Sequence, residues 1–310
     1  MLIRILGSAA GGGFPQINCN CRNCADARAG KAGLTPRTQS SLAVSRDGQS
    51  WVLLNASPDL RQQIAATPPL TPRRQAASRD SPIKAVILTN GDVDHVAGLL
   101  SLREGFAFTL FASSRVLGTL DANSIFKVLD PALVSRVQLD SGHTTELTHA
   151  GASLGLTVEA FPVPGKIALY LENPTAGQSL GTREGDTIGL RVADPSSGAA
   201  FFYIPGCAGV DDTLAARLRG AQLVLFDGTL YSDDEMIAQG LSSKTGKRMG
   251  HISMSGAGGA MVAFRGLGVA RRVFVHINNS NPVLREDSPE RMAVEAAGWE
   301  IAFDGMEMDL

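Results

Sequence analysis

Short apolar runs recur along the chain, and most of them end in glycine or in a polar turn. Those that predict strands lie at 1–6, 84–88, 106–112, 154–161, 201–204, 223–226, 272–275 and 299–303. The run at 84–88 is almost continuously apolar, which is typical of a strand that is covered on both faces. Polar side chains follow several of these runs directly, so we expect the chemistry of the protein at strand ends.

The remaining pattern predicts a hairpin and several helices. Apolar runs at 41–44 and 51–55 flank Arg46-Asp47-Gly48, and Asp-Gly between such runs is a strong hairpin signal. Helices are expected around 60–66, from 97–102 and at 289–297, the last with Ser288 as its cap and Gly298 at its end. A mobile loop is expected at 165–186. Because strands occur both in a hairpin and in alternation with helices, we predict a layered α/β fold with mixed sheets.

Composition excludes several classes of protein. The chain has 310 residues, of which 44% are hydrophobic and 19% charged, so it is not largely disordered. The formal charge of −2 gives no support for binding to nucleic acid or to an anionic membrane. No stretch approaches the roughly 18 apolar residues of a membrane span. The apolar run at the N-terminus is too short for a signal peptide, so a cytoplasmic location is expected.

Three of the four cysteines lie within six positions, at Cys19, Cys21 and Cys24. Thiolates at this spacing can share one Zn²⁺, and such closed sites are usually structural. The alternative is a loop with three free cysteines. We therefore expect a zinc loop at about 17–26, with a fourth ligand from elsewhere in the chain.

Histidine and aspartate residues gather after the predicted strands. Asp92, Asp94 and His95 follow the run at 84–88, and His276 follows the run at 272–275. His251 lies in a turn rich in glycine and serine. Singly, each residue is more often at the surface or at a helix cap, but together they indicate a functional site.

The segment Asn90-Gly-Asp-Val-Asp94-His95-Val-Ala-Gly98 resembles the metal-binding turn of the metallo-β-lactamase superfamily, which normally reads His-x-His-x-Asp-His-x-x-Gly. The resemblance implies an αββα sandwich, in which two mixed β-sheets are flanked by helices and metal lies between the sheets. It also implies a single domain over 1–310.

The departures from that superfamily pattern affect the first metal site. Asn90 and Asp92 replace its first two histidines, Gly165 lies where the third belongs, and Cys207 replaces the bridging aspartate. What remains of the pattern is the second site, formed by Asp94, His95 and His276. The resemblance therefore implies one active-site metal rather than two.

Longer motifs resemble the protein B family of pyrroloquinoline quinone (PQQ) biosynthesis. They include Gly7-Ser-Ala-Ala-Gly-Gly-Gly-Phe-Pro-Gln16, Asn18-Cys-Asn-Cys-Arg-Asn-Cys24 and His276-Ile-Asn-Asn-Ser-Asn-Pro282. The resemblance implies iron- and O₂-dependent hydroxylation of the tyrosine ring in a peptide or amino-acid precursor of PQQ. Other PQQ biosynthesis proteins are the expected partners, and a homodimer stays open.

Two histidines and one carboxylate suit a mononuclear non-haem Fe(II) oxygenase. The same ligands with water suit a zinc-dependent hydrolase, which is one alternative. A soluble carrier that helps to move PQQ or its precursor to the periplasm is another. His251 is a candidate proton donor, and Asp92 a candidate extra ligand or partner of a ligating histidine. Weaker site candidates are Ser253, Asp227 and Arg61, and Asn279 is a candidate fourth ligand of the cysteine site.

Overall fold

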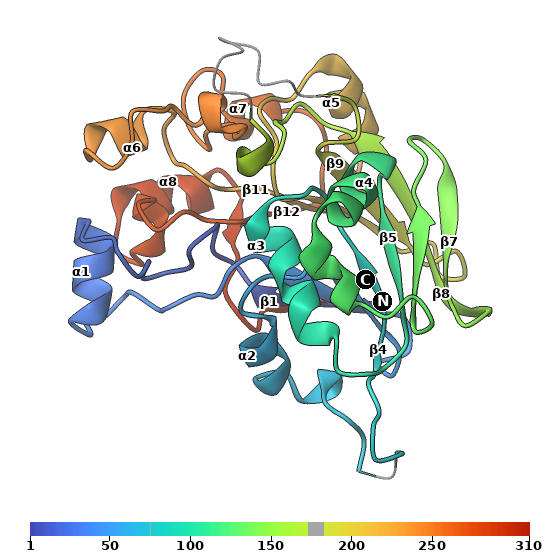
Figure 1. Ribbon diagram of the computed structural model, residues 1–310. Helices are drawn as coiled ribbons and strands as arrows, with labels where there is room; N and C mark the ends of the chain where they lie inside the picture. Colours follow the sequence, from blue (N-terminus) through green and yellow to red (C-terminus); the bar gives the residue numbers. More distant parts are fainter. Residues whose placement is uncertain (75, 173–182) are drawn as a thin grey trace.

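The computed structural model describes residues 1–74, 76–172 and 183–310, and two seven-stranded sheets form the centre of this part of the chain (Figure 1). The first sheet has the order β14-β1-β2-β3-β4-β5-β6 and the second has the order β13-β12-β11-β10-β9-β8-β7. The first consists of β1 (Leu2–Gly7), β2 (Ser41–Ser45), β3 (Trp51–Leu54), β4 (Ile83–Ile87), β5 (Phe108–Ala112), β6 (Val134–Gln138) and β14 (Glu307–Asp309). The second consists of β7 (Thr144–His149), β8 (Ala152–Pro162), β9 (Ile188–Ala193), β10 (Ala200–Ile204), β11 (Leu223–Asp227), β12 (Arg271–Val275) and β13 (Glu300–Ile301).

Both sheets are mixed. In the first, β14, β1, β2 and β3 pair antiparallel, whereas β3, β4, β5 and β6 pair parallel. In the second, β7 to β10 pair antiparallel and β10 to β13 pair parallel. The last strand pairs with the first, with Ile3 opposite Met308, so the two ends of the chain lie side by side (Figure 1).

Helices cover the outer faces of the sandwich. The α-helices are α1 (Arg22–Arg28), α2 (Leu60–Ala65), α3 (Val93–Val96), α4 (Ser114–Ala122), α5 (Asp212–Leu218), α6 (Glu235–Ala238), α7 (Ala260–Ala263) and α8 (Pro289–Ala296). Short 3₁₀ turns are η1 (Pro68–Leu70), η2 (Ala97–Leu102), η3 (Ser124–Val128), η4 (Leu169–Leu171), η5 (Lys247–Met249) and η6 (Pro282–Leu284). No described helix is long and apolar enough to cross a membrane.

Three buried clusters show why this layering is stable. One fills the space between the sheets, with Ile5 and Ile87 from the first and Leu190 and Val273 from the second. A second packs the other face of the first sheet against α2, α4 and η2. The third packs the second sheet against α5, α7 and α8. The αββα sandwich follows from strands that bury both faces.

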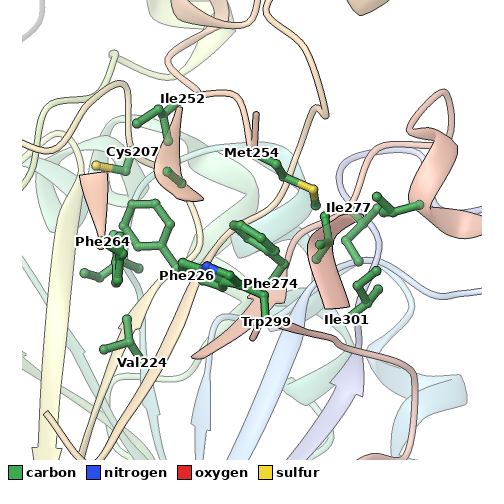
Figure 2. Packing of buried hydrophobic residues seen from close by; sticks show 14 of the residues in the cluster. Cys207, Val224, Phe226, Ile252, Met254, Phe264, Phe274, Ile277, Trp299 and Ile301 are labelled. Carbon is green, nitrogen blue, oxygen red and sulfur yellow. The ribbon is translucent and has the colours of Figure 1, made fainter. Parts of the chain in front are cut away.

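Several aromatic rings pack against one another in the third cluster (Figure 2). Phe274 of β12 stacks on Trp299, with ring centroids 3.9 Å apart, and Phe226 of β11 meets Phe264 edge to face at 4.8 Å. Cys207 lies in the same cluster and is fully buried. This packing fixes the ends of β11 and β12, where polar residues begin.

Several local predictions are confirmed. The hairpin of β2 and β3 forms around the Asp-Gly turn, and Ser288 caps α8 by accepting a hydrogen bond from the Arg291 amide. The expected helix at 97–102 is wrong in type, because a 3₁₀ turn follows the short α3 there. The cause is close packing at Gly98, whose amide donates to the Ala56 carbonyl and where a Cβ would lie 2.2 Å from the Ser57 carbonyl oxygen.

The loop predicted at 165–186 contains the 3₁₀ turn η4. Residues 173–182 of that loop lie outside the described residues. Of the two described portions, the one before this gap contributes Lys166, Leu169 and Glu172 to the candidate site, and the one after it leads into β9.

Candidate metal centre

Asp94, His95 and His276 come together although they lie on different sheets. Asp94 and His95 belong to α3, which follows β4 of the first sheet, and His276 directly follows β12 of the second. The Asp94 Oδ2 atom lies 3.1 Å from His276 Nε2 and 3.9 Å from His95 Nε2. Ligand atoms of all three lie within 4.8 Å of one another. The edge where the two sheets meet therefore holds a cluster of side chains of the types that bind metal ions.

His95 presents a free ring nitrogen in this cluster. Its Nδ1–H donates to Asn90 Oδ1 at 2.7 Å, so the lone pair is left on Nε2. That Nε2 atom is buried and has no hydrogen-bond partner. Burial lowers the pKa of His95 to about 4, so the ring is neutral near pH 7. A buried, neutral and unpartnered imidazole nitrogen is well suited to a metal ion.

Electrostatics within the cluster favour an ionised Asp94. Burial acts to raise its pKa, but the positive charge that His95 carries at low pH and the hydrogen bond with His276 outweigh burial, and together they lower it. Burial acts to lower the pKa of His276, but the hydrogen bond and charge of Asp94 raise it. The carboxylate and the two rings are thus strongly coupled, as expected for groups that share a cation.

The backbone at His276 is unusual. Its φ angle is 57°, which is the left-handed region that non-glycine residues seldom adopt. The segment after β1 holds the next residue in place, because Ile277 N–H donates to the Ser8 carbonyl and Ala10 N–H donates to the Ile277 carbonyl. Such conformations are often found at functional sites.

Thr229 connects three further side chains of the site. Its hydroxyl donates to Asp227 Oδ1 at 2.7 Å, so its oxygen is free to accept from His276 Nδ1–H at 2.8 Å. His251 Nδ1 lies 2.7 Å from Asp227 Oδ2 and 3.0 Å from the same hydroxyl. Asp227 also accepts hydrogen bonds from the amides of Cys207 and Thr229. These contacts orient both histidine rings by their Nδ1 atoms.

Asp227, His251 and His276 form a second group whose ligand atoms lie within 4.8 Å. The oxygens of Asp227 already accept four hydrogen bonds, whereas His95 Nε2 accepts none. The group of Asp94, His95 and His276 is therefore the better candidate metal site. The other group supports it through the shared His276.

The cluster opens into a cavity of about 470 Å³. Asp92, Asp94, His95, His251 and His276 all line it. Asp92 Oδ1 accepts a hydrogen bond from the amide of Leu169 at 3.3 Å, and burial together with the charge of Asp94 raises its pKa. In the described part of the chain, Asp92 joins neither ligand group. Its expected role as a ligand or ligand partner stays a prediction.

The residues that depart from the superfamily pattern have other contacts. Asn90 holds His95, as described above. A Cβ on Gly165 would lie 2.7 Å from Thr187, so that position is filled by close packing. The Cys207 Sγ atom donates to the Gly209 carbonyl inside the hydrophobic core, and burial raises its pKa to about 12.

The three cysteines of the predicted zinc loop also come together. Their sulfur atoms lie within 4.8 Å of one another, and α1 begins directly after Cys21. The side-chain amide of Asn279 lies 3.1 Å from Cys19, 3.7 Å from Cys21 and 3.4 Å from Cys24. The structure therefore brings the suggested fourth ligand to this cluster.

Sequence reasoning undervalued Asp227 and missed Thr229. The available signal was position, because Asp227 ends the buried strand β11 and Thr229 follows it, just as His276 follows β12. Two weaker candidates lie outside the ligand groups among the described residues. Ser253 donates to the Ser255 carbonyl, and Arg61 is exposed.

Comparison with known proteins agrees with this architecture. The model of a β-lactamase superfamily domain matches residues 50–277. A diphosphatase of the PhnP family shares the fold, with a TM-score of 0.68 at 20% identity over 100% of this chain and 97% of that one. The chain is therefore a metallo-β-lactamase-type αββα sandwich of the β-lactamase superfamily.

Closer relatives define its place in that superfamily. Coenzyme PQQ synthesis protein B of Rhizobium meliloti (strain 1021) is 53% identical over 99% of this chain and 97% of that protein. The crystal structure of Zn²⁺-bound PqqB from Methylobacterium extorquens is 51% identical over the full length of both chains, with a TM-score of 0.94. The chain belongs to the coenzyme PQQ synthesis protein B family, and its role is in PQQ biosynthesis.

Proposed function

We propose that the protein is an iron-dependent oxygenase that hydroxylates the tyrosine-derived ring of a PQQ precursor. The observation that carries this proposal is the buried and unpartnered His95 Nε2 atom beside Asp94 and His276. Two imidazoles and one carboxylate, with the remaining positions open to a cavity, are typical of mononuclear non-haem iron sites. Bound Fe(II) would supply the activation of O₂.

The residues fit a metal ion for a second reason. Asn90 and Thr229 occupy the Nδ1 atoms of the two rings, so both Nε2 atoms face the cluster: that of His95 has no partner, and that of His276 lies 3.1 Å from Asp94 Oδ2. Hydrogen bonds to the outer ring nitrogen also increase the basicity of the inner one. Asp94, His95 and His276 would hold the metal, and the cavity would hold the precursor next to it.

Other side chains would position the substrate and move its protons. Asp227 accepts from His251 Nδ1, which leaves the Nε2 atom of this cavity-lining ring free for proton exchange with a bound phenol. Asp92 lines the same cavity and would accept hydrogen bonds from polar groups of the precursor. We assign these roles to His251 and Asp92 as parts of the same proposal.

We also propose that Cys19, Cys21 and Cys24 bind a structural Zn²⁺. The proximity of the three sulfur atoms supports it, as does the burial of Cys19 and Cys24. Asn279 would complete the site if its amide turned to present the oxygen. Thiolate ligands favour zinc, whereas the nitrogen and oxygen donors of the other cluster also suit iron.

The test is anaerobic loading with Fe(II), followed by O₂ and tyrosine-containing peptides, with the product mass as readout. A gain of one oxygen atom with iron but not with zinc is expected. His95→Ala and His276→Ala should each abolish turnover, while their far-UV circular dichroism matches that of the parent. Equal turnover with zinc and masses of hydrolysis products would identify a hydrolase instead. Tight binding of PQQ without turnover under either metal would identify a carrier.

A further inference from the structure

Three basic side chains share a single carboxylate at the cavity. Lys166 Nζ lies 3.4 Å from Glu172 Oε1, while Lys244 Nζ and Arg248 Nη1 lie 3.9 Å and 3.8 Å from Oε2. Lys166, Lys244 and Glu172 line the cavity that contains the candidate metal centre. The side chains of Lys166 and Glu172 are largely buried, and those of Lys244 and Arg248 are about two-fifths exposed.

The local sequence brings these charges together. Lys244 and Arg248 flank the start of η5, and Gly250 ends this turn in the left-handed conformation, with φ at 89°. The stem of Lys166 crosses Gly250 so closely that a Cβ there would lie 2.8 Å from its Cγ. A glycine at this position therefore lets Lys166 reach the basic turn.

The charges at this end of the cavity do not balance. Of the described acidic residues, Glu172 is the one within ion-pair distance of Lys166, Lys244 or Arg248. The neighbouring segment 173–182 contains no aspartate or glutamate. At ion-pair distance one carboxylate thus faces three cations, while Asp92 lies farther away in the same cavity, where the charge of Lys166 acts to lower its pKa. In addition, Arg248 Nη1 is buried with no hydrogen-bond partner and lies 3.8 Å from Glu172 Oε2, so this guanidinium donor faces the shared carboxylate without a hydrogen bond to it.

We propose that Lys166, Lys244 and Arg248 form a carboxylate-binding site that selects and orients the substrate. The excess of cations over carboxylates at this end of the cavity suits a substrate that carries carboxylates, such as an acidic peptide with the reacting aromatic ring. Its carboxylates would bind at the basic end, and its ring would then extend toward Asp94, His95 and His276. This inference rests on the proposed function for the identity of the ring, but the charge selection stands by itself.

The experiment measures binding and needs no turnover. Calorimetric titration without O₂ compares glutamyl-tyrosine, which has two carboxylates, with glutaminyl-tyrosine amide, which has none. The parent protein should bind the acidic dipeptide about three- to tenfold more tightly, because charged hydrogen bonds in a partly buried site have effects of this size. Lys166→Gln, Lys244→Gln and Arg248→Gln should each reduce this preference.

Two further variants test the direction and the specificity of the change in affinity. Glu172→Gln removes the internal competitor and should raise the affinity for the acidic dipeptide severalfold, opposite to the change from the cation variants. Lys247→Gln is the matched control, because Lys247 lies in the same turn but is exposed and is not within ion-pair distance of Glu172. It should leave the preference unchanged.

The possible outcomes separate this inference from the proposed function. If the cation variants weaken the binding of both dipeptides equally, or lower only the melting temperature, the cluster only stabilises the loop and the inference is wrong. It is also wrong if Glu172→Gln lowers the affinity for the acidic dipeptide. A charge preference that persists in a protein without oxygenase activity would overturn the proposed reaction alone.

Discussion

Replacing Thr229 with valine tests whether the hydroxyl at the centre of the site sets the orientation of His276. Valine has nearly the same shape, so the packing of this buried position should be conserved. The change removes the acceptor of His276 Nδ1–H at 2.8 Å and one donor to Asp227 at 2.7 Å. Three other hydrogen bonds to Asp227 remain, so the larger effect should fall on His276.

The expected magnitude follows from these contacts. A buried donor that loses its acceptor costs about 1–3 kcal/mol, so the free energy of unfolding should fall by about 2 kcal/mol. Loss of the partner that orients a ligating histidine typically weakens metal binding by about 10- to 100-fold. Thr229→Val should therefore lose metal affinity even where its fold is intact.

The assay is competition for the metal with a chelator of known affinity, combined with chemical denaturation. Thr229→Ser is the control, because it keeps the hydroxyl and should retain nearly parental metal affinity. If the valine variant binds metal as tightly as the parent and unfolds at the same denaturant concentration, the hydroxyl does not orient His276, and the reasoning fails.

Two further predictions concern the cysteine loop and a buried carboxyl. The double variant Cys19→Ser, Cys21→Ser should contain about one zinc fewer per chain by metal analysis and unfold at lower temperature; an unchanged zinc content would refute the proposed site. Burial raises the pKa of Glu235 to about 7, so its contribution to stability is complete below about pH 4.5 and disappears as the pH rises through 7. The free energy of unfolding of Glu235→Gln, relative to that of the parent, should therefore rise by up to about 3 kcal/mol from pH 5 to pH 8, as measured by denaturation. A difference that does not change with pH would contradict this.

The strands that were predicted correctly are those that carry their own signal. β1, β4, β10, β11 and β12 are short apolar runs, and each is buried over most of its length. β7 was missed because its sequence, Thr144–His149, is largely polar and it lies at the edge of the second sheet. Its position depends on pairing with β8, which no local pattern reveals.

The site shows the same distinction between residues with a local sequence signal and residues that depend on tertiary contacts. The grouping of Asp94, His95 and His276 followed from residue type, strand ends and family resemblance, and the structure brings the three together. The partners of these residues were harder to predict. Thr229 contacts His276 only because β11 and β12 run parallel as neighbours, so their ends meet at one edge.

The two candidate metal centres share one loop, which suggests why they occur in the same protein. His276 belongs to one centre, and Asn279, three residues later, contacts all three cysteine sulfurs of the other. Asn23, within the cysteine loop, donates to the Asn279 carbonyl at 3.2 Å, so α1 also braces this segment. Zinc bound by the cysteines would restrict the backbone next to His276, whose left-handed conformation must be held by its surroundings. The cysteine centre would then act as a positioning element for the active site, without contact with the substrate.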